Sequence, residues 1–357
     1  MDRVTEINFK HDQLRALLTQ RGADTLWIQK THNISWITAG ANPAIPLDNP
    51  TAPYSVIVTA DKRTILADNI ELPRIQAEDR FEDFGFDYAP MRWYDKQIPP
   101  MPNMITDLDG TVDGDLQKLR WKLTEGEQVR LRALGADAAA AIEGAVQTTR
   151  PGDSEWQIAA RLDAACRESG GNAIVNLVAT DERIERYRHP YVTNKRLERY
   201  VLIAVVMRRG GLMVSATRLA YHGQIPSKLL EKARKVATID AQVMVASQPG
   251  RTLGTVFADL QHAYAEVGEA EQWQNHHQGG LTAYRPREVI VTPGNSTVIE
   301  AGNVCAWNPS IVGCKSEDTI LIGENGFEIV SAASPAFPHI DVRVGAQVVR
   351  RPGILEL

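Results

Sequence analysis

Three short stretches carry side chains that could move protons. His189 lies in RYRHP, ahead of an apolar run typical of a strand, and His276 and His277 are adjacent in NHHQGG. Glu317 lies in KSEDTI. Imidazole exchanges protons near neutral pH, and a lone carboxylate in a sheltered cleft can have a raised pKa or pair with an imidazole. The pattern predicts an acid–base site that includes His189, Glu317 and one of the two adjacent histidines.

Each of these residues also has a structural interpretation. His189 could be a surface histidine in a basic loop. An extended strand would turn His276 and His277 to opposite faces, so only one of them could face a cleft, and we interpret His276 as a packed or solvated side chain. Glu317 could instead pair with an arginine and hold a sheet together. On a strand, Asp318 would diverge from Glu317 and bond into a loop.

Further polar residues predict contacts to a ligand. In AYRPRE, the side chains of Tyr284, Arg285 and Arg287 could line the pocket. Guanidinium binds carboxylates through two parallel hydrogen bonds, so an arginine there suggests an anionic group on the ligand, although an exposed salt bridge explains it equally well. Ser215 in VSATR and Asn308 in AWNPS are neutral and could hydrogen-bond a polar substrate or hold a water molecule.

Composition excludes several classes of protein. The chain has 357 residues, 43% of them hydrophobic and 23% charged, with a net charge of −5, so neither nucleic acid nor an anionic membrane is expected as a partner. No apolar run is long enough for a signal peptide or a membrane span, which predicts a cytoplasmic protein. The three cysteines have no zinc-like spacing and are expected to be buried thiols. No G-x-S-x-G, Walker A or G-x-G-x-x-G motif is present.

The elements that must position these residues form two parts. Residues 1–120 predict a small α/β domain with a helix over 9–21, a strand over 33–40 and a hairpin over 53–68, ending in a proline- and glycine-rich passage over 97–115.

Residues 121–357 predict a second domain that opens with a capping box formed by Thr124 and Glu127. A helix pair, strands, helices over 226–245 and 252–268, and further strands then follow, which is an α+β order.

The ordered series of motifs resembles a known family. RPGDSEWQIAARLDAACRESG, RYRHP, GGLMVSATR, NHHQGG, AWNPS and KSEDTI are similar to segments of the creatinase, prolidase and aminopeptidase P group, an M24-type family. The resemblance implies an α+β protein, with a creatinase-like α/β domain over 1–120 and a pita-bread domain over 121–357. It also implies a homodimer.

The same resemblance carries the family's metal-ligand positions onto this chain. They fall at Ala204, Ser215, His277, Asn308 and Glu317, and the family's ligand residue is retained only at His277 and Glu317. Paired divalent ions repel each other strongly unless carboxylates bridge them. We therefore expect no dinuclear metal centre and no cofactor. A single zinc ion on His277, Glu317 and the neighbouring His276 stays open as an alternative.

Three functions follow from the resemblance. The first is a metal-independent hydrolase of a small polar C–N substrate, in which His189 acts as a creatinase-like acid and base. His277, which the resemblance favours over His276, and Glu317 are its other catalytic groups. The second is an Xaa-Pro peptidase or dipeptidase of the M24 type. The third is a non-catalytic pita-bread protein that binds a small ligand or a peptide. We expect the first, with a small molecule or short peptide as substrate.

Overall fold

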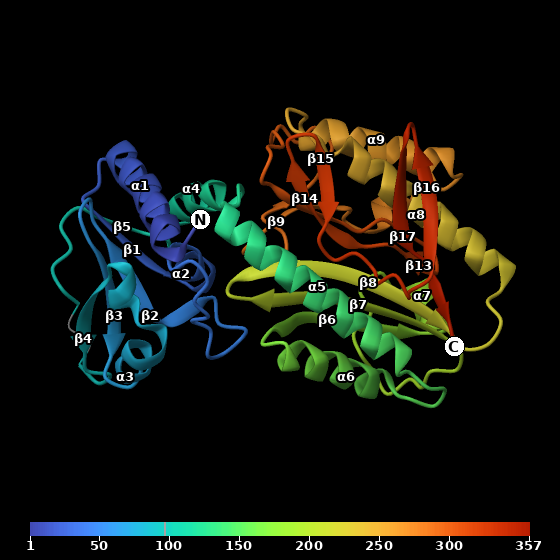
Figure 1. The fold of residues 1–357 in the computed structure, drawn as a ribbon, viewed down its shortest axis with the longest axis horizontal. Coiled ribbons are helices and arrows are strands. Elements are labelled where there is room, and N and C mark those ends of the chain that lie inside the picture. The colour runs from blue at the N-terminus through green and yellow to red at the C-terminus, as the bar shows by residue number, and fades with distance from the viewer. Residues whose placement is uncertain (96–97) are drawn as a thin grey trace. The chain divides into compact units, whose positions relative to one another are not determined.

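The computed structural model describes residues 1–95 and 98–357 (Figure 1). The chain divides into two compact units, one comprising Met1–Glu127 with Gly210–Leu212 and the other comprising Gln128–Arg209 with Met213–Leu357. The first residue of the proline-rich passage, Gln97, lies outside the described residues. No helix in the described ranges is both long and apolar enough to cross a bilayer.

The first unit is built on a five-stranded sheet with the strand order β4-β3-β2-β1-β5. Strand β2 pairs antiparallel with both β1 and β3, which confirms the predicted hairpin, whereas β4 and β5 are parallel to their neighbours. The strands are β1 (Thr25–Lys30), β2 (Thr51–Val58), β3 (Arg63–Asp68), β4 (Asp87–Met91) and β5 (Met104–Thr106). The helices and turns are α1 (Arg3–Arg21), α2 (Thr31–Ile37), α3 (Leu72–Arg74), η1 (Ile75–Asp79), η2 (Phe81–Phe84) and α4 (Gly110–Arg120).

The strand predicted over 33–40 is wrong, because helix α2 occupies most of that segment. Nearly every residue of α2 is buried, so the sequence shows no clear helical period there. The side-chain amide of Asn33 donates to Asp107 at 2.9 Å and to Asp113 at 3.0 Å. These partners are distant in sequence, and tertiary contacts of this kind override local propensity.

The second unit contains two larger sheets with the strand orders β18-β8-β7-β6 and β10-β9-β11-β14-β15. Two hairpins, β12–β13 and β16–β17, complete it. The helices are α5 (Glu125–Gln147, which begins in the first unit), α6 (Glu155–Glu168), α7 (Glu182–Arg186), α8 (Ser227–Ala246), α9 (Leu253–Glu266) and the 3-10 turn η3 (Gln272–Asn275). The strands are β6 (Asn172–Thr180), β7 (Tyr200–Arg209), β8 (Leu212–Tyr221), β9 (Gly279–Thr282), β10 (Val289–Ile290), β11 (Val304–Trp307), β12 (Ser310–Ile311), β13 (Cys314–Lys315), β14 (Asp318–Gly323), β15 (Gly326–Ile329), β16 (His339–Val344), β17 (Gln347–Pro352) and β18 (Ile354–Glu356).

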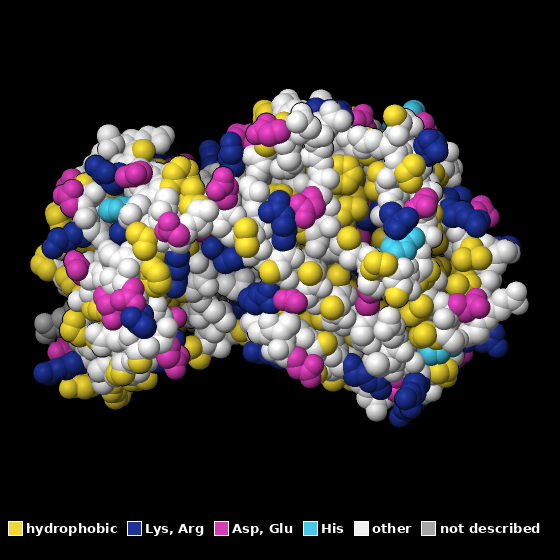
Figure 2. Space-filling view, viewed as in Figure 1, with side chains coloured by type: hydrophobic (Ala, Val, Ile, Leu, Met, Phe, Trp, Pro, Cys, Tyr) yellow, Lys and Arg dark blue, Asp and Glu magenta, His cyan; other side chains and the backbone are white. Residues whose placement is uncertain are grey.

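The predicted order of helix pair, strands, helix pair and strands is confirmed. Helix α6 packs on β6, and α8 packs against α9 and against strands of the C-terminal region (Figure 1). The Thr124–Glu127 capping box is present: the Thr124 N–H donates to the Glu127 carboxylate at 2.7 Å, and the Glu127 N–H donates to Thr124 Oγ1 at 3.2 Å. All three cysteines are free and buried. On the face shown in Figure 2, cationic and anionic side chains are interspersed.

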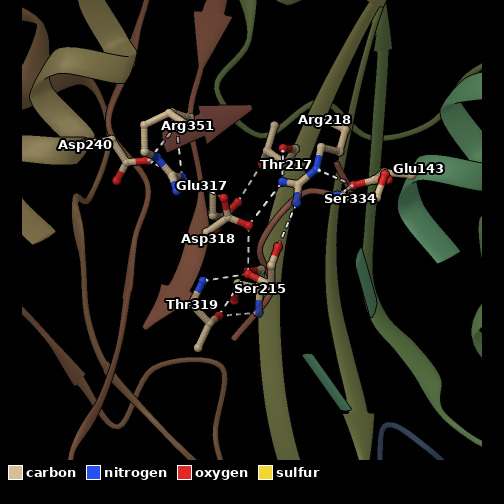
Figure 3. Close-up of polar contacts among 12 residues, drawn as sticks. Glu143, Ser215, Thr217, Arg218, Asp240, Glu317, Asp318, Thr319, Ser334 and Arg351 are labelled. Atoms are coloured by element: carbon tan, nitrogen blue, oxygen red, sulfur yellow. Dashed lines mark hydrogen bonds and ion pairs between the residues drawn. The ribbon is translucent and has the colours of Figure 1, made fainter. Parts of the chain in front are cut away.

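The two larger sheets of the second unit meet along β8. The Thr217 N–H donates to the Glu317 carbonyl at 3.0 Å, and the Ser215 N–H donates to Thr319 Oγ1 at 2.8 Å (Figure 3). Because side chains alternate along a strand, Ser215 and Thr217 share one face of β8, whereas Arg218 lies on the other. This contact places Ser215 and Thr217 beside Glu317.

A buried ionic network holds the strand that follows Glu317 (Figure 3). Arg351 on β17 donates from Nη2 to Asp240 at 2.6 Å and to Asp318 at 2.7 Å. Arg218 donates to Asp318 at 3.1 Å, and its Nε lies 3.6 Å from Glu143. The Arg351, Asp240, Asp318 and Arg218 side chains are all fully buried. The network therefore ties α8, β8 and β17 to the first residue of β14.

Replacing Arg351 with methionine should destabilise the protein strongly, because it leaves the carboxylates of Asp240 and Asp318 buried without their main cation. We expect a loss of about 3–5 kcal/mol in the free energy of unfolding, measured by chemical denaturation. Arg350 is the matched control: its side chain is 64% exposed and pairs with Asp341 at 3.2 Å. Arg350→Met should cost less than about 1 kcal/mol. Equal losses in the two variants would contradict the assignment.

Candidate active site

One cavity of about 390 Å³ in the second unit brings most of the predicted site residues together. Its polar lining includes His189, His277, Arg287, Asn308, Lys315 and Glu317, and Asn176 and Tyr191 contribute further polar groups. Strands β6 and β7 supply an apolar part that includes Ile174, Val175, Leu177, Ala204 and Val206. The cavity is therefore amphipathic, which is usual for sites that bind small molecules.

The Glu317 carboxylate is held by two cations. Lys315 Nζ lies 2.7 Å from Oε2, and Arg287 Nη2 lies 3.0 Å from Oε1. Thr217 donates its hydroxyl proton to Oε2 at 2.8 Å. Burial alone would raise the pKa of Glu317, but Lys315 and Arg287 outweigh it and lower the pKa to about 2. The possibility of a raised pKa, which the sequence analysis considered for Glu317, is therefore wrong. The Glu317 carboxylate is ionised at neutral pH.

The Arg287 guanidinium joins strand β8 to the segment that precedes β14. Its Nη1 donates to Ser215 Oγ at 3.1 Å, while Nη2 donates to Glu317. The Arg287 side chain is only 9% exposed. Its charge therefore lies between Ser215 and Glu317, two positions at which the family resemblance places metal ligands.

Three imidazoles cluster beside this ion pair. His276 Nε2 and His189 Nε2 are 2.8 Å apart, and the rings of His276 and His277 stack with their centroids 4.5 Å apart. The prediction that His276 and His277 point to opposite faces is wrong. Both residues lie between η3 and β9, outside any strand, so strand alternation does not apply to them. The prediction of His276 as only a packed side chain also missed its bond to His189.

The three rings are neutral near pH 7. Burial is the main cause that lowers the pKa of His276 to about 2 and the pKa of His277 to about 4, and repulsion from nearby cations adds to it. Burial and the charge of Lys315 also lower the pKa of His189. A hydrogen bond between two Nε2 atoms requires one proton between them. In either arrangement, Nδ1 of His189 is the ring nitrogen left for a substrate.

The glycines of NHHQGG allow a close approach of strands. Gly279 has a φ of +104°, and a Cβ atom there would lie 2.0 Å from the carbonyl oxygen of Ala306. The Asn308 N–H donates to the Gln278 carbonyl at 3.2 Å. A side chain at Gly279 would push β9 away from β11 and separate the histidines from Asn308.

The structure does not bring every predicted residue to the cavity. Tyr284 is fully buried and Arg285 is partly exposed, and neither belongs to the cavity lining. Ser215 is buried and reaches the site through its hydrogen bond to Arg287. Of the predicted ligand-binding residues, Arg287 and Asn308 line the cavity themselves.

Sequence reasoning missed two residues of the site, Lys315 and Thr217, and it considered a third, His276, only as a packed or solvated side chain or as one ligand of a single zinc ion. Two of them carry a signal that could have been used. Lys315 lies two residues before Glu317, and Thr217 lies two residues after Ser215, so on an extended backbone each shares a face with a residue already singled out. His276 was identifiable only by its position in space.

A model of metallopeptidase family M24 matches residues 130–324, which is more than half of the chain. The chain belongs to metallopeptidase family M24. The mixed α/β architecture predicted from the resemblance is thereby confirmed.

Two relatives and one solved structure are similar to this M24 member at low sequence identity. An uncharacterised peptidase of Staphylococcus aureus is 22% identical over 230 residues, covering 62% of this chain and 66% of that relative, slightly less than two thirds of its length. An Xaa-Pro dipeptidase of Pyrococcus horikoshii is 22% identical over 353 residues, covering 90% and 96% of the two chains. A prolidase crystal structure from the same organism has a TM-score of 0.75 at 19% identity, covering 92% and 99%.

The residues of this M24 member do not fit a pair of divalent cations. Among residues 1–95 and 98–357, one group of three or more potential ligands has its donor atoms within 4.8 Å of one another: His189, His276 and His277. Neutral imidazoles supply no negative charge to offset two dications. The nearby carboxylate, Glu317, is already ion-paired by Lys315 and Arg287.

The lowered pKa values of His276 and His277 predict a pH dependence of stability. The folded protein binds protons at these rings less readily than the unfolded chain, in which the pKa of histidine is about 6.5. Their stabilising contribution is therefore present above pH ~6.5 and is lost as the pH falls toward 4, at up to about 1.4 kcal/mol per pH unit for each ring.

The variant His276→Gln should show a shallower loss of unfolding free energy between pH ~6.5 and ~4 than the parent protein. His262→Gln is the control, because the His262 side chain is 76% exposed and pairs only with Glu266 at 3.2 Å among the contacts described. Denaturation curves at a series of pH values provide the measurement. An unchanged slope in His276→Gln would contradict the burial argument.

Proposed function

We propose that this M24 member is a hydrolase that cleaves an amide-type C–N bond in a small polar substrate without a pair of metal ions. The observation that carries this proposal is the position of the Arg287 guanidinium and the Lys315 ammonium on the Glu317 carboxylate. The chain's own cations take up the negative charge that a divalent ion would need.

Electrostatics supports this assignment. At ~4 Å and an effective dielectric constant of ~20, each pair of unit charges interacts with about 4 kcal/mol. A divalent ion placed beside Glu317 would gain from one carboxylate but would be repelled by both Lys315 and Arg287. The three neutral histidines would not compensate for this repulsion. Bond cleavage in this site therefore depends on proton transfer by imidazole.

We assign that transfer to His189. With the shared proton on Nε2 of His189, which donates to His276, the unprotonated Nδ1 of His189 can take a proton from an attacking water and give it to the leaving nitrogen. In this step the water oxygen bonds to the carbonyl carbon, the C–N bond breaks, and the proton ends on the amine. His276 acts as a positioning residue that holds the His189 ring, and Glu317 holds the two cations in place.

The test is hydrolysis of dipeptides and N-acyl amino acids before and after exhaustive chelation. We expect turnover to survive EDTA and to fall by about 10²-fold or more in His189→Gln, because general acid–base catalysis contributes rate factors of that size. His262→Gln should keep full activity. Activity that disappears with EDTA and returns with Mn²⁺ would exclude the metal-independent mechanism. A protein that binds these compounds without any turnover would instead be a non-catalytic binder.

An Xaa-Pro dipeptidase is the second candidate, and the comparisons with known proteins support it better than they support a metal-independent hydrolase. The relative from Pyrococcus horikoshii that bears this name aligns over 96% of its length. If it applies here, glycylproline should be cleaved faster than glycylalanine, as measured by release of the C-terminal amino acid. Repeating the assay with added Mn²⁺ shows whether cleavage of glycylproline depends on metal, which is a separate question from substrate preference. Equal rates on glycylproline and glycylalanine would remove this candidate.

A further inference from the structure

The cavity carries an excess of positive charge. Lys315 and Arg287 contribute two cations, Glu317 contributes one anion, and burial keeps His276 and His277 neutral at pH 7. The Lys315 side chain is only 8% exposed, so water screens its charge weakly. A charge imbalance in a sheltered cavity favours a ligand of opposite sign.

Several polar atoms of the lining are buried and lack a hydrogen-bond partner among the described residues. They are the Arg287 Nε–H, which is a donor, Asn308 Oδ1, which is an acceptor, and Nδ1 of His277. Asn308 is only 2% exposed. The Lys315 ammonium has three N–H groups, and Glu317 is the one acceptor described for it. Buried polar atoms of native proteins usually find partners, so these atoms indicate a ligand with matching groups.

We propose that the cavity binds a small monocarboxylate that also carries an amide N–H. The Lys315 ammonium and the Arg287 guanidinium hold the ligand's carboxylate, and Asn308 Oδ1 accepts from its N–H. The ligand's carboxylate and the Glu317 carboxylate both pair with Lys315 and Arg287. Because Glu317 remains ionised, the cavity has a net excess of one positive charge. A monoanion is therefore favoured over a dianion.

The apolar part of the cavity completes the description of the ligand. Ile174, Val175, Leu177 and Val206 offer a surface for a short aliphatic group. Together with the polar wall, this describes an N-acyl amino acid that binds through its carboxylate. This inference names the substrate class of the proposed hydrolase and rests on that proposal.

The experiment measures binding rather than turnover. N-acetylglycine carries both a carboxylate and an amide N–H, and N-acetylglycinamide is its neutral counterpart. The full-length protein is titrated with each compound at millimolar concentrations by ligand-observed NMR, without added metal. We expect N-acetylglycine to bind at least about tenfold more tightly than the amide, because hydrogen bonds to charged groups are the stronger ones.

Two variants with opposite expected effects test the cations. Lys315→Met should weaken N-acetylglycine binding by about tenfold or more, and Glu317→Gln should tighten it, because a competing anion is removed. Lys232→Met is the matched control, since Lys232 is 34% exposed, lies 3.5 Å from Glu185 and does not line the cavity. It should leave binding unchanged. If Lys315→Met does not fold, Lys315→Arg should retain binding and Glu317→Gln still supplies the test.

Several outcomes would overturn the inference: equal binding of the two compounds, no binding of either, equal effects of Lys315→Met and Lys232→Met, or binding that requires added Mn²⁺ or Zn²⁺. The result is separable from the test of hydrolysis. A protein that binds N-acetylglycine as described but hydrolyses nothing would refute the proposed function alone. A metal-independent hydrolase that binds the neutral amide equally well would refute this inference alone.

Discussion

The ion-paired Glu317 carboxylate is the interaction on which the chemistry of this cavity depends. Lys315 lies on the same extended segment two residues earlier, whereas Arg287 arrives from the segment after β9. Thr217 on β8 adds a hydrogen bond from the other sheet of the unit. Separating these charges would leave buried ions unpaired, which costs several kcal/mol. The arrangement therefore fixes where the two sheets meet and also sets the charge of the cavity.

Adjacent carboxylates serve different purposes because they point in different directions. Glu317 lines the cavity, whereas Asp318 turns into the protein and pairs with Arg218 and Arg351 (Figure 3). The buried network around Asp318 holds the start of β14. A fixed strand start in turn keeps Glu317 at the distance that Lys315 and Arg287 require. The peptide bond between Glu317 and Asp318 thus connects the lining of the cavity to the buried ionic network.

The M24 fold is retained here with a different distribution of charge. Neutral imidazoles, two cations and one anion line the cavity where a metal pair would need several carboxylates. Burial keeps His276 and His277 unprotonated at neutral pH, so they do not add to the positive charge. Fold similarity at 19% identity establishes the architecture, and the chemistry has to be argued from the residues of the site.

The sequence alone determined the architecture and several of the site residues. Capping at Thr124, the hairpin of β2 and β3, and the α8 and α9 helices follow from local signals whose periods and turn residues are readable without tertiary contacts. His189, His277, Arg287, Asn308 and Glu317 were singled out by residue type and motif, and they line one cavity. These features depend on local sequence signals, which can be recognised without the tertiary structure.

Tertiary structure decided what those residues are paired with. Helix α2 replaced a predicted strand because its polar side chains find partners far along the chain. Tyr284 and Arg285 do not line the cavity. His276 bonds to His189, although nothing in the local sequence around His276 indicated this contact. Lys315 forms an ion pair with Glu317. A pKa and an ion pair depend on burial and on distances of a few ångströms between segments remote in sequence. Those distances exist only once the two sheets have met along β8.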